Sequence, residues 1–337
     1  MEYASLRVLV AGATGTIGEA TVRELQQQGH EVVCLLRHQS AESLQRWVLR
    51  LPGALLRQVD MCSAQSLQRD GFCGEHFDAV VSCLASRSGV PADAWAIDHH
   101  AQSLLLQAAQ AGGVKQFVLL SAICVQKPLL AFQHAKLAFE RELMASDMQW
   151  SIVRPTAFFK SLSGQIARVR SGKPFLVFGD GQLTACKPIS DADLARYLAD
   201  CLHDPSRARR VLPIGGPGPA ITPLQQGQLL FDAVGRPARF KRVPVALLDV
   251  IVAVLSVLGR VVPALAAKAE LARIGRYYAT ESMLVWDAAA GRYDADATPS
   301  TGTQTLVQHY AAVLRGDAQV TLGDHAVFGK DGGRYRD

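Results

Sequence analysis

Residues Leu6–Gly18 read L-R-V-L-V-A-G-A-T-G-T-I-G. The apolar run ends at Ala11 and leads into three spaced glycines and a helix-like stretch, which is the order that opens a dinucleotide-binding βαβ unit. Gly12 permits a tight turn, Gly15 lets the backbone approach a pyrophosphate, and Gly18 allows close helix packing. The following helix would offer its N–H groups and positive dipole end to the phosphates. The sequence therefore predicts a dinucleotide site here.

Strand-like apolar runs alternate with amphipathic stretches through the first half of the chain. Such alternation predicts an α/β fold with a doubly wound parallel sheet, in which ligands bind beyond the carboxyl ends of the strands. The expected strands are Arg7–Ala11, Glu31–Leu36, Leu55–Val59, Ala79–Leu84, Gln116–Ser121 and Trp150–Val153, and the expected helices are Gly15–Gln28, Asp93–Ala111 and Leu129–Ala145.

After about Pro155 the pattern loosens, which predicts a smaller substrate-side domain. We expect an NADP-binding Rossmann-like domain over residues 1–157. A mainly substrate-side domain over 158–316 would return some segments to the sheet, and 317–337 would be a loosely ordered tail. In this half the expected strands are Phe175–Phe178 and Val211–Ile214, and the expected helices are Asp191–His203, Thr222–Val234, Val243–Leu258 and Pro263–Arg276.

Bulk composition excludes several classes of protein. Hydrophobic residues make up 49% of the 337 residues and charged residues 19%, so a large core is expected rather than disorder. The net charge of +5 is dispersed, which argues against nucleic-acid binding. None of the seven cysteines forms C-x-x-C, so we expect buried reduced thiols and no metal site. No signal peptide precedes the first strand and no apolar stretch has transmembrane length, which predicts a cytoplasmic protein.

The residue that follows the second expected strand indicates which cofactor binds. An NAD site usually carries an acid here for the ribose 2′-hydroxyl, whereas this chain has Arg37 followed by His38. A guanidinium can pair with a 2′-phosphate, so NADPH is favoured, although Arg37 could also be an ordinary surface residue. Asp60, after the third strand, is placed to meet the adenine amino group or to cap the next helix. Cys83 and Leu84 would pass close to the cofactor as backbone.

A tyrosine that short-chain dehydrogenases use is missing. They carry Tyr-x-x-x-Lys on the helix after the fifth strand, and the spacing places both side chains on one helix face. Here residues 132–136 read F-Q-H-A-K, so Phe132 stands where the tyrosine would be and Lys136 remains. Without that acid, carbonyl reduction is disfavoured, whereas reduction of a conjugated C=C bond leaves a charge that can delocalise. The alternative is that Phe132 and Lys136 are only a core and a surface residue.

Longer motifs give the chain a family resemblance. Residues 121–140 (S-A-I-C-V-Q-K-P-L-L-A-F-Q-H-A-K-L-A-F-E), 154–161 (R-P-T-A-F-F-K-S), 178–181 (F-G-D-G), 186–190 (C-K-P-I-S) and 281–285 (E-S-M-L-V) resemble the NADPH-dependent divinyl chlorophyllide 8-vinyl reductases. The resemblance covers nearly the whole chain. It implies an atypical short-chain reductase that, like the isoflavone reductase group, lacks the tyrosine and keeps the lysine. The implied substrate is divinyl chlorophyllide or protochlorophyllide, whose 8-vinyl group becomes ethyl.

Motifs and resemblance together define the candidate site. Lys136 and Ser121 are the candidate catalytic residues, and Phe132, Phe158 and Phe159 are candidates for an apolar substrate pocket. Val243–Leu258 could rest on a membrane peripherally, but we expect a buried helix because it lacks a basic face. The candidate cofactor-binding residues are Gly12, Thr14, Gly15, Thr16, Ile17, Gly18, Arg37, Asp60, Cys83, Leu84, Lys136 and Pro155.

Two other functions are compatible with parts of the sequence. A non-catalytic NADP(H)-binding regulatory or assembly protein would bind the dinucleotide without turning it over, as several tyrosine-less relatives do. A sugar-nucleotide epimerase fits poorly because it needs the missing tyrosine.

Overall fold

The computed structural model describes residues 4–317, which divide into two compact units. The first unit runs up to Ser86 and adds Pro91–Pro155 and Asp191–Ile214. The second contains Arg87–Val90, Thr156–Ser190 and the described chain from Gly215 onward. The tail expected over residues 317–337 lies outside the described residues except for Asp317.

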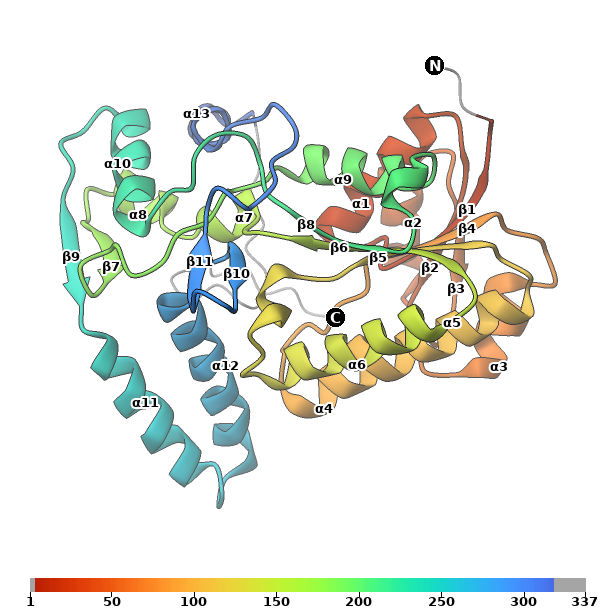
Figure 1. Cartoon of the computed structure of the whole chain (residues 1–337), viewed down its shortest axis with the longest axis horizontal. Helices are drawn as coiled ribbons and strands as arrows, with labels where there is room; N and C mark the ends of the chain where they lie inside the picture. Colours follow the sequence, from red (N-terminus) through yellow and green to blue (C-terminus); the bar gives the residue numbers. More distant parts are fainter. Residues whose placement is uncertain (1–3, 318–337) are drawn as a thin grey trace. The chain divides into compact units, whose positions relative to one another are not determined.

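A seven-stranded, entirely parallel sheet forms the centre of the first unit (Figure 1). Its strand order is β3-β2-β1-β4-β5-β6-β8. The chain adds β2 and β3 on one side of β1 and then crosses over to add β4 and the later strands on the other side. At β1, Leu9 therefore lies opposite Val33 of β2 and Val80 of β4. This crossover point is where doubly wound sheets bind ligands. The strands are β1 (Arg7–Ala11), β2 (Glu31–Leu36), β3 (Leu55–Gln58), β4 (Ala79–Ser82), β5 (Gln116–Leu120), β6 (Gln149–Pro155) and β8 (Arg210–Ile214).

Helices cover both faces of this sheet. In Figure 1, α1 and α9 lie on one face, where they contact each other, and α5 and α6 lie on the other. The central strands are therefore buried on both sides and are apolar except for one residue at an end of each, Arg7, Ser82 and Gln116. The helical segments are α1 (Thr16–Gln27), α2 (Ala41–Arg50), α3 (Ala64–Ser66), η1 (Leu67–Phe72), α4 (Pro91–Ala94), η2 (Trp95–Ala101), α5 (Gln102–Ala111), η3 (Ile123–Gln126), α6 (Ala131–Ala145), α9 (Asp191–Asp200) and η4 (Pro205–Arg207).

The core of the first unit joins the sheet to α5 and α6. Leu9, Val80 and Phe117 from the strands pack with Leu105 and Phe139 from these helices, and none is more than 1% exposed. Burial of this kind contributes about 25 cal/mol per Å² of apolar surface. The close packing fixes where each strand ends and hence where the residues that follow it lie.

The second unit is built from short strands and helices. Its core packs Phe159, Val169, Phe175, Phe231 and Tyr310 together. Two small sheets, β7 with β9 and β10 with β11, accompany the helices. The elements are α7 (Phe159–Leu162), α8 (Ile166–Arg170), β7 (Phe175–Phe178), α10 (Pro223–Val234), β9 (Phe240–Val243), α11 (Val245–Leu258), α12 (Pro263–Thr280), β10 (Val285–Asp287), β11 (Arg292–Asp294) and α13 (Leu306–Arg315).

One expectation about the second unit is wrong. The stretch expected as a buried helix over Val243–Leu258 begins at Val245 as α11, because Val243 pairs with Phe178 at the end of β9. No residue of α11 is buried. High hydrophobicity alone does not bury a helix, since burial requires a neighbour on every face, and α11 packs mainly on α12.

The expectation of buried cysteines holds only in part. Cys34, Cys124 and Cys201 are buried, whereas Cys62 and Cys73 are exposed, and all seven are free. The two exposed cysteines follow β3 and η1 in turns, where the apolar pattern gives no information on burial.

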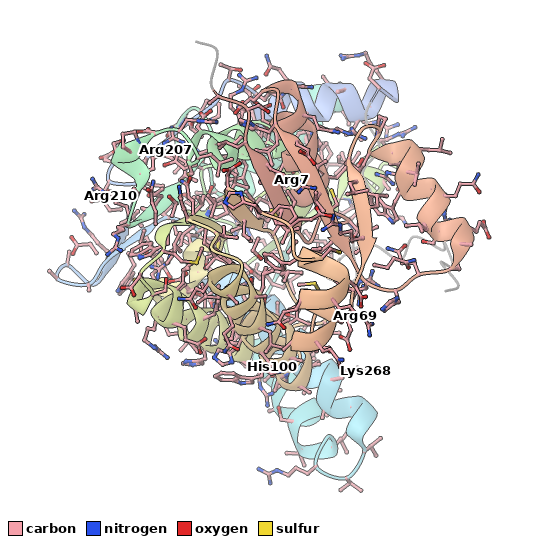
Figure 2. All side chains as sticks on the ribbon, turned by 90° about the vertical axis from the view of Figure 1, so that its right-hand side faces the viewer. Arg7, Arg69, His100, Arg207, Arg210 and Lys268 are labelled. Atoms are coloured by element: carbon pink, nitrogen blue, oxygen red, sulfur yellow. The ribbon has the colours of Figure 1, made fainter. Side chains whose placement is uncertain are left out.

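Charged residues on the first unit form ion pairs and small ion-pair networks at several places on its surface. Figure 2 shows Arg7, Arg69 and Arg207 at different places on its surface. Arg7 pairs with Glu31 at 2.8 Å, Arg69 with Asp70 at 2.7 Å, and Arg207 with Asp204 at 3.0 Å. Exposed pairs of this kind contribute little to stability, about 0–1 kcal/mol each.

Two stacked histidines of the first unit predict a loss of stability in acid. His30 Nε2 lies 3.0 Å from His203 Nε2, and His30 Nδ1 accepts a bond from the Leu6 N–H, so His30 Nε2 carries the proton that His203 accepts. Burial, and then the charge of His203, lower the pKa of His30, and burial lowers that of His203. The unfolded chain therefore binds more protons below about pH 6.5, and the free energy of unfolding should fall there.

Denaturant melts at pH 7.5 and 5.5 measure this loss. The wild type should lose stability between the two values, and His203→Gln, whose amide oxygen can still accept from His30, should lose less. His134→Gln, at an exposed position, is the control and should behave as the wild type. An unchanged loss in His203→Gln would contradict the account.

Candidate cofactor and active site

The glycine turn after β1 is held by close backbone contacts. Gly12 has φ of +80°, and a Cβ there would lie 2.6 Å from the Cys83 carbonyl group. A Cβ on Gly18 would lie 2.1 Å from the Gly12 oxygen, so α1 packs against the turn itself. The Gly15 N–H donates to the same oxygen at 3.0 Å. Only glycine fits at 12 and 18, and the turn that results is tight and rigid.

Gly15 leaves an open approach to the start of α1. A Cβ at Gly15 would meet nothing closer than 3.4 Å, and no side chain caps the helix there. Thr14 is partly exposed, Gly15 and Thr16 are exposed, and Ile17 is buried. Uncapped N–H groups at a helix N-terminus bind phosphate well, so these residues fit a dinucleotide pyrophosphate.

Two other candidates follow neighbouring strands at the same edge of the sheet. Arg37 is exposed directly after β2, and Asp60 is exposed after β3. Asp60 Oδ1 accepts from the Cys62 N–H at 2.9 Å, whereas Ser63 caps the next helix by accepting from the Ser66 N–H. Asp60 therefore forms a local turn, and the alternative that it caps this helix is wrong.

The loop after β4 is fixed by a buried glutamine. Ser82 Oγ donates to Gln102 Oε1 at 2.7 Å, and Gln102 Nε2 reaches the Leu84 oxygen at 3.5 Å. Cys83 donates its N–H to Ala11 at 2.8 Å, which joins the loop to the glycine turn. Burial raises the pKa of the Cys83 thiol to about 12, so it stays protonated and is no nucleophile.

Lys136 is held by a buried carboxylate that the sequence did not single out. Its Nζ lies 2.9 Å from Asp98 Oδ1, and the two side chains are 11% and 0% exposed. An ammonium has three protons, so two remain available beside this bond. Asp98 Oδ2 is buried with no hydrogen-bond partner in the described part of the chain. A buried carboxylate oxygen without a donor is costly, and a ligand hydroxyl would satisfy it.

Asp98 reaches this position from η2, a π-helical segment between α4 and α5. Its wider turn changes which side chains face the sheet, and such segments are frequent at functional sites. The Ser86 N–H adds a 3.3 Å bond to Asp98 Oδ1. No periodicity in the sequence indicates this irregular turn, which is why Asp98 was missed.

Ser121 is part of a second buried network. Its Oγ donates to Glu140 Oε1 at 2.5 Å, and Arg154 binds the same carboxylate through Nε, at 3.1 Å, and Nη2. Glu140 is fully buried. Because the only hydroxyl proton of Ser121 is engaged with Glu140, Ser121 can accept a hydrogen bond but has no proton left to donate. Glu140 lies one helical turn after Lys136, a spacing that could have indicated it.

These groups line a narrow crevice that is too small to hold a water molecule. Gln102 and Phe139 line it together with residues of the Lys136–Asp98 pair and of the Ser121–Glu140 network. All of its residues belong to the first unit. Its lining consists of Asp98, Gln102, Leu119, Leu120, Ser121, Lys136 and Phe139.

The aromatic candidates differ in their surroundings. Phe132, in the first turn of α6, is half-buried one helical turn before Lys136. Phe158 is half-buried, whereas Phe159 is 4% exposed and packs against the tilted ring of His309 in the core of the second unit. Pro155 is buried at the end of β6. Among the three phenylalanines, Phe159 is thus the least accessible to a ligand.

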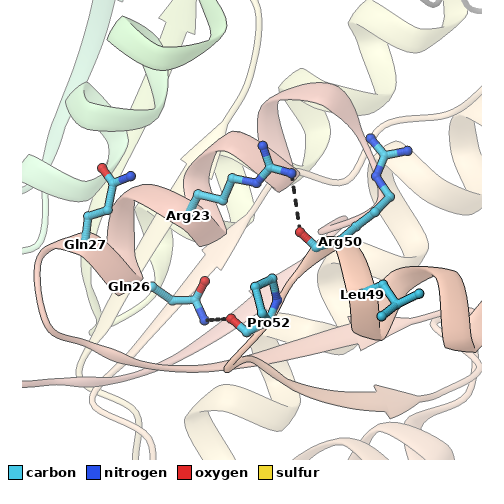
Figure 3. Close-up of a pocket in the computed structure, with 6 residues that line it drawn as sticks. All are labelled: Arg23, Gln26, Gln27, Leu49, Arg50 and Pro52. Atoms are coloured by element: carbon cyan, nitrogen blue, oxygen red, sulfur yellow. Dashed lines mark hydrogen bonds between the residues drawn. The ribbon is translucent and has the colours of Figure 1, made fainter.

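Another hollow on the first unit lies away from the glycine turn (Figure 3). It is lined by the end of α1 and the end of α2, where Arg23 donates to the Arg50 oxygen and Gln26 to the Pro52 oxygen. Arg23 is seven residues along α1 from Thr16, about 10 Å along its axis. This hollow has no part in the site described here.

Two features are absent from residues 4–317. Within them, no three His, Cys, Asp or Glu side chains are grouped so as to hold a metal ion. None of the helices in that range is both long and apolar enough to cross a membrane.

Comparisons with known proteins place the chain among NAD(P)H-binding proteins. The model of a family described as NAD(P)H-binding matches residues 12–205. Among curated proteins, the chloroplastic divinyl chlorophyllide a 8-vinyl-reductase of Oryza sativa subsp. indica is 48% identical over 331 residues, which are 95% of this chain and 82% of that protein. The photosystem II assembly factor Ycf39 of Synechocystis sp. is 29% identical over 249 residues, 72% of each chain.

A solved structure shares the fold. The NADPH-dependent quinone oxidoreductase of Escherichia coli in complex with NADPH has a TM-score of 0.67, with 17% identity over 91% of this chain and 99% of that chain. The similarity concerns the fold alone, and it agrees with the predicted doubly wound Rossmann-like sheet.

The buried pair of Lys136 and Asp98 predicts a specific rescue. Asp98→Asn removes the counter-charge from a nearly buried ammonium and should destabilise the protein by about 3 kcal/mol. Adding Lys136→Met should restore most of that stability, because no charge is then left unpaired, but activity should stay low. Thermal melts, cofactor titration and turnover of the three variants measure this.

Arg69→Met, at an exposed ion pair, is the matched control and should change stability little. If the double variant is no more stable than Asp98→Asn, the two side chains are not coupled as described.

Proposed function

The chain belongs to the family of divinyl chlorophyllide a 8-vinyl reductases, and we propose that it uses NADPH to reduce the 8-vinyl group of divinyl chlorophyllide or protochlorophyllide to ethyl. Its similarity to such a reductase extends over 95% of its length. The observation within the site that carries the proposal is Phe132, one helical turn before Lys136, in place of an acid. A phenyl ring cannot protonate an alkoxide, so the site suits a C=C bond better than a carbonyl.

The residues around the glycine turn hold the cofactor in this proposal. Bound NADPH would supply a hydride for the vinyl group. The N–H groups at the start of α1, which no side chain caps, bind the pyrophosphate, and Gly15 allows its close approach. Arg37 pairs with the 2′-phosphate, which favours NADPH over NADH. Thr14, Thr16 and Ile17 present the surrounding backbone.

Lys136 and Asp98 act as one unit. Asp98 fixes the ammonium at 2.9 Å, so two of its protons point to other partners, among them the nicotinamide ribose. The unpartnered Asp98 Oδ2 accepts from a ribose hydroxyl. Contacts of the ribose with the Lys136 ammonium and the Asp98 carboxylate orient the nicotinamide. A reactant that is already held in the correct position loses less entropy on the way to the transition state.

The chemical balance requires one hydride and one proton. The hydride adds to one vinyl carbon, and the electron pair of the C=C bond moves into the conjugated macrocycle. A proton then adds to the other carbon and completes the ethyl group. Lys136 can relay this proton from solvent, whereas Ser121 positions its neighbours, since its own proton is engaged with Glu140.

A large flat substrate needs apolar contact, and Phe132 and Phe158 are half-buried candidates for it. Phe159 contributes least to such contact, because it is almost fully enclosed in the core of its unit.

A second function is favoured by the 29% identity to a photosystem II assembly factor. Such a protein would bind the dinucleotide without oxidising it. Purified protein given NADPH and divinyl protochlorophyllide or chlorophyllide separates the two proposals. Loss of NADPH absorbance together with equal growth of the monovinyl product is expected. Cofactor binding with no product would overturn the reductase proposal and favour the assembly function.

The 2′-phosphate contact predicts a change in cofactor preference. Arg37→Glu places a carboxylate beside the 2′-phosphate and should weaken NADPH binding about tenfold or more, while NADH binding changes little. Fluorescence titration with both cofactors measures this. Arg46→Glu, on the following helix, is the control and should leave both affinities unchanged. Equal losses of the two affinities in Arg37→Glu would remove the proposed role.

A further inference from the structure

Helix α11 exposes a continuous apolar surface. Six of its side chains are between 39% and 60% exposed, and none of its residues is buried. Val261, in the turn that follows, is 84% exposed. We name as the apolar face of α11 the side chains of Leu247, Val250, Ile251, Val254, Val257 and Leu258.

These residues share one side of the helix. At 100° per residue their spacing of three and four covers an arc of about 120°. The polar residues Asp249 and Ser256 lie opposite, and both bind α12: Asp249 pairs with Arg276, and Ser256 Oγ accepts from Arg273 at 2.7 Å. α11 and α12 run side by side as a hairpin (Figure 1).

This arrangement lacks the polar outer side of a usual surface helix. A helix in water normally turns its apolar side to the protein and its charges outward. Here Asp249 and Ser256 lie on the side of α11 that meets the neighbouring helix, together with half-buried apolar residues, and the exposed side is apolar as well. An exposed patch of this extent marks an interaction site.

The charge around the hairpin indicates the partner. Residues 236–280 contain eight lysines and arginines and two acids, a net charge of +6 against +5 for the whole chain. Both acids are paired, Asp249 with Arg276 and Glu270 with Arg273. Lys241, Arg242, Arg260 and Lys268 are exposed, and Figure 2 shows Lys268 on this hairpin.

We propose that the apolar face of α11 docks the protein on an anionic lipid bilayer, with the cationic side chains around the hairpin contacting headgroups. A second copy of the chain would bring two such basic regions together, which like-charge repulsion disfavours. The helix has 14 residues, about 21 Å, and is too short to cross a core of about 30 Å. It therefore lies in the membrane–water interface, where the buried apolar area and the cationic charge both contribute to the binding free energy.

This docking goes beyond the proposed reduction and is tested without it. Flotation of the full chain is measured with vesicles of phosphatidylcholine alone and of phosphatidylcholine with phosphatidylglycerol in equal parts. The protein should bind the anionic vesicles about tenfold more strongly, and about 1 M salt should weaken this binding. The variant Val250→Asp/Val254→Asp should lose binding about tenfold or more.

The matched control is Val48→Asp/Leu49→Asp on α2, where the side chains are 53% and 76% exposed. It should bind vesicles as the wild type does. Both variants should be folded, because all four substituted positions are exposed. Thermal melts and NADPH titration check this. Wild-type binding by the α11 variant, or absence of vesicle binding by the wild type, would overturn the proposal. A dimer that only the α11 variant dissociates, without vesicle binding, would assign the face to a second copy instead.

Discussion

The backbone oxygen of Gly12 is the point on which the site is built. It accepts the Gly15 N–H, and it occupies the place that a Cβ of Gly18 would need. The Gly12 α-carbon in turn lies against the backbone of Cys83. Strand β1, the start of α1 and the loop after β4 therefore meet without side chains between them. This backbone packing leaves α1 uncapped and open toward a phosphate.

The chemistry then depends on two buried carboxylates. Asp98 holds the ammonium of Lys136, and Glu140 accepts the hydrogen bond of the Ser121 hydroxyl while Arg154 balances its charge. Neither arrangement offers a strong acid where a carbonyl reductase would have its tyrosine, since Phe132 fills that position. A conjugated C=C bond needs no such acid during hydride transfer, because the charge that the hydride leaves can delocalise. A site without the tyrosine hydroxyl is therefore compatible with the activity of the family.

The regular part of this fold could be predicted, and the irregular part could not. β1 and β2 have the expected bounds, because continuous apolar runs mark strands buried on both faces. Asp98 was missed because η2 departs from the periodicity on which prediction relies. The exposure of α11 was missed for another reason: its sequence shows how apolar it is but not whether a neighbour covers it.

Isotope labelling can show whether a hydride from NADPH and a proton from solvent reduce the vinyl group. The protein is given divinyl protochlorophyllide with NADPH deuterated at the transferred position, in ordinary water, and then with unlabelled NADPH in heavy water. Mass spectrometry of the product should find one deuterium in the new ethyl group in each case. An ethyl group with no deuterium from the cofactor would contradict the account.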